Sequence, residues 1–226
     1  MKENGNNQNV KEFSLEERIF DFAYEMALRD ATLQQSYKGT DKKALRTNNE
    51  ARQFVNEYIK AVFMGTQPCF YDTERKVENS FRVFIKNKKL TTKKGTLAEF
   101  SFGNAQKLIN MTAKYMYISA YANDVLRERF QCCHCPMDSI MVERIIDLID
   151  EVSLSDSEDK KITGLLKEHN KSNLTWKQFL RQAWSKITLS DYAQYKLFQG
   201  FVMFFAERDG LSAIDFDFKY RSSRND

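Results

Sequence analysis

The sequence predicts an all-α protein, and three observations lead to this fold class. Only 8 Gly and 2 Pro occur among 226 residues, too few for the turns of an all-β fold or for a Gly-rich dinucleotide-binding fold. Hydrophobic residues make up 42% of the chain, which suffices for a packed core and excludes a disordered protein. Apolar residues recur at helical spacing along most of the chain. We expect one all-α domain over residues 13–226, with two lobes divided near Phe100 as an option, after a disordered polar segment over 1–12.

The individual helices are expected between glycines, prolines and capping residues. Ser14 and Glu17 form a capping-box pattern that begins a helix ending near Tyr37. Asp138 follows a proline and is a good N-cap for an amphipathic helix. A long final helix is expected to end before Gly210. The helices after the first are expected over about 41–64, 73–90, 104–121, 138–149, 160–169, 175–187 and 190–209.

The sequence shows neither a membrane-spanning segment nor a signal-peptide pattern. It contains no run of about 18 apolar residues, the length that a membrane-spanning helix needs. Its Asn-rich beginning is unlike a signal peptide. We therefore expect a cytoplasmic monomer that does not contact a membrane.

Basic residues are concentrated in the middle of the chain. Residues 75–114 hold ten Lys and Arg against Glu78 and Glu99, so this stretch is strongly positive although the whole chain is only +4. Such segregation favours a polyanionic partner. The alternative is a solvated helix face followed by a basic loop. The ten residues are Arg75, Lys76, Arg82, Lys86, Lys88, Lys89, Lys93, Lys94, Lys107 and Lys114.

Three of the four cysteines lie beside a histidine, in the run Cys132, Cys133, His134 and Cys135. A structural zinc site normally joins a closely spaced pair of ligands to a second pair further along the chain. The remote candidates here are only Cys69 and His169. We therefore expect reduced thiols that bind no metal, with zinc as the alternative.

Two short segments carry residues suited to chemistry. Gly103 to Lys107 reads Gly-Asn-Ala-Gln-Lys and opens a predicted helix, and Asp138 follows Pro136 further along the chain. Free backbone N–H groups at a hairpin and a helix N-terminus suit a phosphate. An amine and a carboxylate beside such a site can form a lyase-type centre. The amine would act as nucleophile, and the carboxylate would stabilise positive charge or move a proton.

This arrangement resembles the helix-hairpin-helix DNA glycosylase superfamily, in which a glycine-containing hairpin leads into a catalytic lysine and a Pro-x-Asp follows. It is most similar to the archaeal 8-oxoguanine glycosylase branch, where a Gln-Lys pair opens the helix and a second lysine lies seven residues later. Gln106, Lys107 and Lys114 match that pattern. The resemblance covers residues 103–140 and departs from the family in its single hairpin glycine. No cysteine follows the aspartate, so we expect neither an iron–sulfur cluster nor another cofactor.

The resemblance implies a DNA glycosylase that flips a damaged or modified base out of double-stranded DNA and excises it. Asp138 would stabilise the positive charge that develops on the sugar, and Lys107 would attack the sugar in an AP-lyase step. The excised base is 8-oxoguanine-like or a hypermodified base, as in phage DNA, so both repair and antiviral defence stay open. We expect DNA contacts at Gly103, Asn104, Gln106, Lys93, Lys94 and His134, and base-pocket walls at Lys114 and Trp184.

Two other classes of function remain open at this point. A non-catalytic helical module could bind nucleic acid through residues 75–94, with an affinity that falls steeply with salt. Lys107 and Asp138 would then be dispensable. A helical interaction protein could instead present its basic face to an acidic protein, and would not bind nucleic acid at physiological salt.

Overall fold

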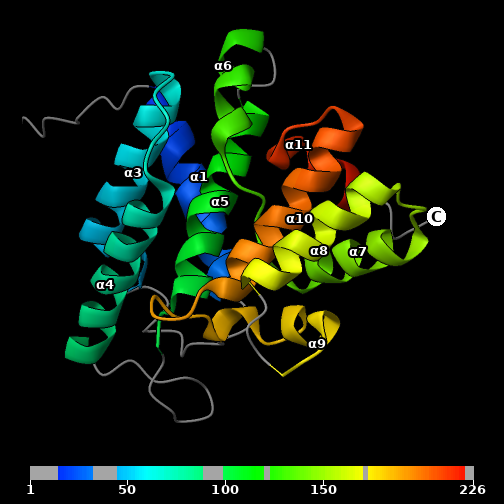
Figure 1. Ribbon diagram of the computed structural model, residues 1–226. Coiled ribbons are helices and arrows are strands. Elements are labelled where there is room, and N and C mark those ends of the chain that lie inside the picture. Colours follow the sequence, from blue (N-terminus) through cyan, green and yellow to red (C-terminus); the bar gives the residue numbers. More distant parts are fainter. Residues whose placement is uncertain (1–14, 33–44, 89–98, 120–122, 170–172, 222–226) are drawn as a thin grey trace, which may run out of the picture.

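The computed structural model describes residues 15–32, 45–88, 99–119, 123–169 and 173–221. All regular elements in these ranges are helices, which confirms the all-α prediction (Figure 1). No helix of the described ranges is long and apolar enough to cross a membrane. The polar N-terminal segment, the Ser14 cap and the basic loop with Lys93 and Lys94 lie outside the described residues.

The first half of the chain forms a group of helices around one central helix. Helices α1 and α4 both pack against α5, and α3 packs mainly against α4 (Figure 1). Buried aromatic and aliphatic side chains fill the space between them, with the Phe81 and Phe100 rings stacked at 4.0 Å between centroids. The bounds are Leu15–Thr32 for α1, Asn49–Phe63 for α3, Phe70–Lys88 for α4 and Phe102–Ser119 for α5.

The second half lies on the other side of α5 (Figure 1). Helix α10 is its centre and contacts α7, α8, α9 and α11. The bounds are Asp124–Arg129 for α6, Phe130–Cys132 for the 3-10 turn η2, Ser139–Glu151 for α7, Asp156–His169 for α8, Trp176–Leu180 for α9, Trp184–Lys186 for the 3-10 turn η3, Ala193–Asp209 for α10 and Ala213–Arg221 for α11.

Two predicted helices are interrupted in the structure, in each case where a polar side chain bonds backbone groups at the break. The helix predicted over 41–64 is broken at Asn48, whose side chain accepts the Ala51 N–H at 3.0 Å and begins α3. The helix predicted over 175–187 ends at Leu180. The side-chain amide of Gln194 donates hydrogen bonds to the carbonyl groups of Leu180 and Gln182, at 2.9 and 2.8 Å. These bonds satisfy carbonyl groups at the end of α9, and the chain turns before η3.

Helix α11 was not anticipated, although the sequence contains a signal for it. Gly210 adopts φ 67° and ends α10 in the left-handed conformation, as predicted for a helix that stops before this glycine. Ser212 then accepts the Asp215 N–H at 3.2 Å, which is an N-terminal cap. This helix returns the chain to the beginning of α7 and to the C-terminal half of α5, and it brings Asp217 and Arg221 there.

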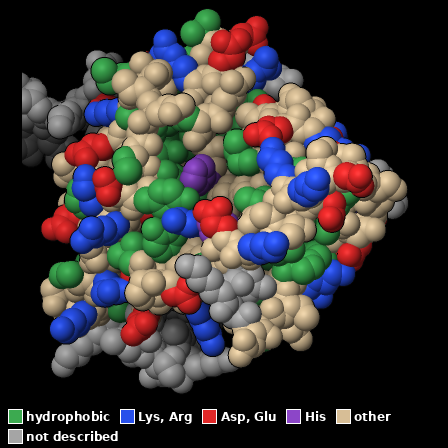
Figure 2. Space-filling view, viewed as in Figure 1, with side chains coloured by type: hydrophobic (Ala, Val, Ile, Leu, Met, Phe, Trp, Pro, Cys, Tyr) green, Lys and Arg blue, Asp and Glu red, His purple; other side chains and the backbone are tan. Residues whose placement is uncertain are grey.

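Helix α5 is buried on all sides over residues 102–114. Lys107 and Lys114 are therefore interior residues rather than surface charges. Two of the ten cations counted between residues 75 and 114 thus contribute little to the surface, so the local charge overstates a basic face. Figure 2 shows basic and acidic side chains interspersed over one face of the molecule, which is hollowed near its centre where a histidine is visible.

Candidate active site

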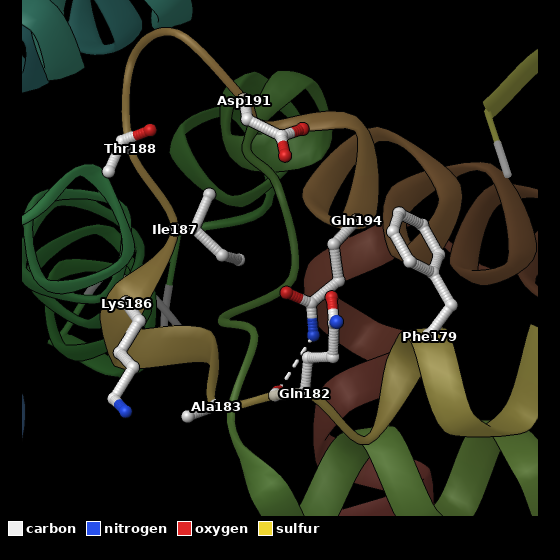
Figure 3. Close-up of a pocket in the computed structure, with 8 residues that line it drawn as sticks. All are labelled: Phe179, Gln182, Ala183, Lys186, Ile187, Thr188, Asp191 and Gln194. Carbon is white, nitrogen blue, oxygen red and sulfur yellow. Dashed lines mark hydrogen bonds between the residues drawn. The ribbon is translucent and has the colours of Figure 1, made fainter. Parts of the chain in front are cut away.

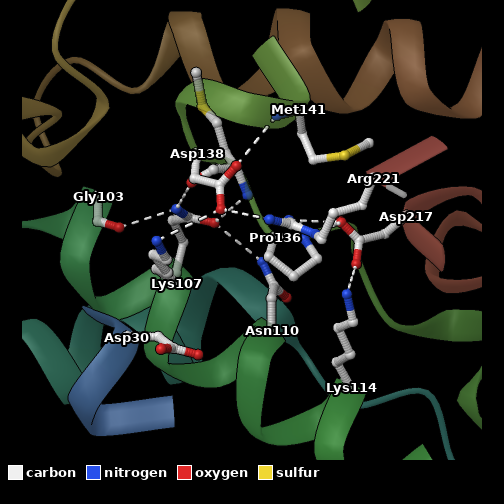
Figure 4. Close-up of polar contacts among 12 residues, drawn as sticks. Asp30, Gly103, Lys107, Asn110, Lys114, Pro136, Asp138, Met141, Asp217 and Arg221 are labelled. Atoms are coloured by element: carbon white, nitrogen blue, oxygen red, sulfur yellow. Dashed lines mark hydrogen bonds and ion pairs between the residues drawn. The ribbon is translucent and has the colours of Figure 1, made fainter. Parts of the chain in front are cut away.

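The structure brings Lys107 and Asp138 together (Figure 4). Lys107 Nζ lies 3.5 Å from Asp138 Oδ2, and the two side chains are only 11% and 8% exposed. Asp138 is the N-cap of α7, as predicted, and its Oδ1 accepts the Met141 N–H at 3.1 Å. Lys107 lies in the second turn of α5 rather than in the first, because this helix begins at Phe102. The helix dipole therefore acts on Lys107 less than expected.

Asp138 is held as an anion. Burial raises the pKa of this carboxyl, but the positive charges of Arg221 and Lys107 outweigh burial and leave the pKa below its ordinary value. The guanidinium donates to Oδ2 at 2.8 Å, so this one oxygen faces two cations. Such a carboxylate is a weak proton acceptor and is suited to stabilising positive charge.

The ion pair continues into a longer network that sequence analysis missed. Arg221 also donates to Asp217 Oδ1 through two nitrogens, at 2.9 and 2.6 Å. Asp217 is fully buried and forms an ion pair with Lys114, whose amine lies 4.5 Å from the Phe218 ring centroid. Lys114 was expected to line a base pocket. In this structure its amine forms an ion pair with the Asp217 carboxylate of α11.

Gln106 connects α5 to the segment that carries Asp138. Its amide nitrogen donates to the Met137 carbonyl at 2.8 Å, and its amide oxygen accepts the Met137 N–H at 3.1 Å. The side chain is completely buried. Gln106 was expected to contact DNA. In this conformation it instead fixes the position of Asp138 relative to Lys107.

The N-terminus of α5 is covered by η3. The Gly103 N–H donates to the Ile187 carbonyl at 3.2 Å, and a Cβ at this position would lie 2.8 Å from the Trp184 carbonyl carbon. We expected free N–H groups here that could bind a phosphate, but the Gly103 amide is already engaged. The glycine is needed for close packing. Trp184 is buried and its ring centroid lies 4.8 Å from Lys107 Nζ, so this predicted pocket residue does reach the site.

Asn104 and His134 are two further residues that were predicted to contact DNA. Asn104 is buried, and neither polar atom of its side chain has a hydrogen-bond partner. His134 Nδ1 lies 3.0 Å from the Tyr195 hydroxyl, and its ring packs on Phe70 at 4.1 Å between centroids. Burial lowers the pKa of His134 to about 4, so the ring is neutral at pH 7 and offers no charge to a phosphate.

The cysteine run forms no metal centre in the part of the chain that is described, where no three His, Cys, Asp or Glu side chains are grouped to hold an ion. All four thiols are free. Burial raises the pKa of Cys135, whose Sγ lies 3.8 Å from Asp217 Oδ1. This thiol is therefore a neutral neighbour of the charged network.

A cavity of about 350 Å³ lies beside η3 (Figure 3). Lys186 and Asp191 flank it, and the Gln194 amide that ends α9 lies at its wall. Neither Lys107 nor Asp138 lines it. The cavity does, however, leave space next to the turn that carries Trp184, which covers Lys107.

Comparison with protein-family models found no matching family, and neither the curated proteins nor the solved structures contain a significant match. The resemblance to the glycosylase superfamily therefore depends on the motif residues alone.

Proposed function

We propose that the protein is a DNA glycosylase with AP-lyase activity, acting on a damaged or modified base in double-stranded DNA. The observation that carries this proposal is the buried Lys107–Asp138 pair at 3.5 Å, formed by residues far apart in the sequence. A resemblance of sequence motif alone does not require these side chains to meet. Their meeting gives an amine and a permanent anion at one place, which is what the chemistry needs.

In the proposed reaction the bond between base and sugar breaks, and the base leaves with the electron pair and takes up a proton. Positive charge then develops on the sugar, and the Asp138 carboxylate stabilises it in a site from which water is excluded. Lys107, after giving its proton to solvent, forms a bond from its nitrogen to the sugar carbon. The sugar ring then opens as its oxygen takes up a proton, and the adduct becomes a Schiff base. Loss of a proton from the adjacent sugar carbon expels the 3′ phosphate and cuts the strand.

Access to Lys107 requires movement, since its side chain and that of Asp138 are almost buried. The part of the structure that covers the amine is Trp184 of η3. We expect this turn to move when an extruded base enters, with the Trp184 ring as the surface on which the base stacks. The cavity beside η3 provides space for that movement.

The test is borohydride trapping during incubation with duplexes that carry 8-oxoguanine, hypermodified pyrimidines or an abasic site. Reduction of the Schiff base should give a covalent protein–DNA adduct, and Lys107→Gln should abolish it. Lys160→Gln is the matched control, because this exposed lysine lies on α8. Base release without an adduct would leave a glycosylase that uses water. If DNA binds but no base is released from any duplex, the non-catalytic module is the better description.

A further inference from the structure

Five charged side chains of the described residues are joined by ion pairs around Asp138. Lys107 and Arg221 share Asp138, while Arg221 and Lys114 share Asp217. These contacts join three cations to two carboxylates, and Arg221 is the only cation that touches both carboxylates (Figure 4). Each carboxylate is therefore shared by two cations, so one cation could lose its proton without leaving a buried carboxylate unpaired.

The contacts indicate which cation can lose that proton. An arginine stays protonated in proteins, so Arg221 cannot. Lys114 is in direct ion-pair contact with Asp217 in the fully buried part of the network. Lys107 makes the longest of these contacts, 3.5 Å, to an oxygen that Arg221 approaches to 2.8 Å. Its proton is therefore the one least needed to neutralise a carboxylate.

We infer that Arg221 is a positioning residue of the proposed reaction, which holds Asp138 and takes over its charge so that Lys107 is free to act as nucleophile. The inference rests on the proposed function for its role in turnover. The contacts behind it, those of Lys107 and Arg221 with Asp138 Oδ2, do not depend on any substrate. Without Arg221, Lys107 and Lys114 would each be left with one carboxylate, and Lys107 would need its proton to neutralise Asp138.

The other titratable groups facing this network do not replace Arg221. Asp30 of α1 adds a third carboxylate beside the network and accepts the Tyr115 hydroxyl at 2.7 Å (Figure 4). Burial raises the pKa of Tyr115 to about 12, so this phenol stays neutral. Cys135 is likewise a neutral thiol, since burial raises its pKa. The Trp184 ring over Lys107 carries no charge.

The experiment measures the pH at which Lys107 becomes reactive, first without DNA. The folded protein is methylated with formaldehyde and cyanoborohydride over a range of pH, and modification of Lys107 is followed by peptide mass spectrometry. Arg221→Gln should raise the pH of half-maximal modification by about one unit, the usual effect of removing a nearby positive charge. Arg221→Lys, which keeps the charge, should stay close to wild type. Asp217→Asn should lower the pH of half-maximal Lys107 modification, because Arg221 then pairs with Asp138 alone.

The second arm follows adduct trapping on a cleavable duplex. Arg221→Gln should slow trapping by about tenfold at pH 7, with recovery at higher pH, since one pH unit changes the unprotonated fraction tenfold. Arg181→Gln is the control, because this arginine makes a comparable two-nitrogen contact with Glu143 on the surface.

An unchanged Lys107 midpoint in folded Arg221→Gln would overturn the inference. If that variant does not fold, an unchanged midpoint in Asp217→Asn would overturn it. Absence of trapping by the wild-type protein on every duplex would count against the proposed function only, because the methylation midpoints still decide the role of Arg221.

Discussion

Asp138 uses its two carboxylate oxygens for different purposes, and a substitution can separate them. Oδ1 caps α7, and Oδ2 faces Lys107 and Arg221. Asparagine is an equally good N-cap, so Asp138→Asn should keep α7 in place and DNA binding intact. It removes the anion, and base release should fall by at least about 100-fold, the scale expected for losing a preorganised charge.

The measurement for Asp138→Asn is single-turnover base release, with circular dichroism to show that the helices are kept. A moderately lower melting temperature is expected, since two buried cations lose their common anion. Activity within a few-fold of wild type in the folded variant would exclude Asp138 as the catalytic carboxylate.

At the scale of the element, α5 and η3 pack closely because residue 103 is a glycine and has no Cβ. A Cβ at Gly103 would overlap the Trp184 carbonyl group, which is backbone and cannot rotate away. Gly103→Ala should therefore destabilise the protein by about 3 kcal/mol and displace η3 from Lys107. Gly164→Ala is the matched control, because nothing lies within 4 Å of a Cβ at this helical position. It should be neutral or stabilising by up to about 1 kcal/mol.

Urea unfolding of the two glycine variants checks this prediction. Equal stability of the Gly103→Ala and Gly164→Ala proteins would mean that η3 does not pack on α5 in solution. The turn would then be open without substrate, and Lys107 would be more exposed than in the structure described above.

The helices could be predicted from the sequence to the extent that their signals are local. The Asp138 cap and the end of α10 before Gly210 follow from neighbouring residues and were found. Lys107 and Asp138 were selected as a pair through the motif. Arg221 and Asp217 were not, because their importance arises from contacts about 80 and 100 residues away in the chain, for which no periodicity exists. The close packing at Gly103 was not anticipated for the same reason, since the Trp184 carbonyl that it accommodates is remote in sequence.

At the scale of the whole molecule, the charge that would attract DNA is smaller than the sequence count suggests. Lys107 and Lys114 are interior ion-pair residues, and Arg82 on α4 pairs with Glu78. Arg75, Lys76 and Lys86 remain as exposed cations along α4. Lys93 and Lys94 follow this helix in the sequence and lie outside the described residues, so a DNA track would combine α4 with the segment that comes after it.

The last prediction tests whether binding depends on where the charge lies or only on how much there is. Reversing Lys93 and Lys94 to Glu changes the net charge from +4 to 0. Reversing Lys160 and Lys167, exposed on α8, changes it equally. If DNA follows the basic segment, the first double variant should weaken binding of every duplex and flatten the dependence of affinity on salt, because fewer counterions are released. The second should have a much smaller effect, since long-range attraction is screened beyond about 10 Å at 0.1 M salt. Equal losses in the two variants, measured by fluorescence anisotropy over a series of salt concentrations, would show that net charge alone governs binding and that residues 75–94 are an ordinary solvated surface.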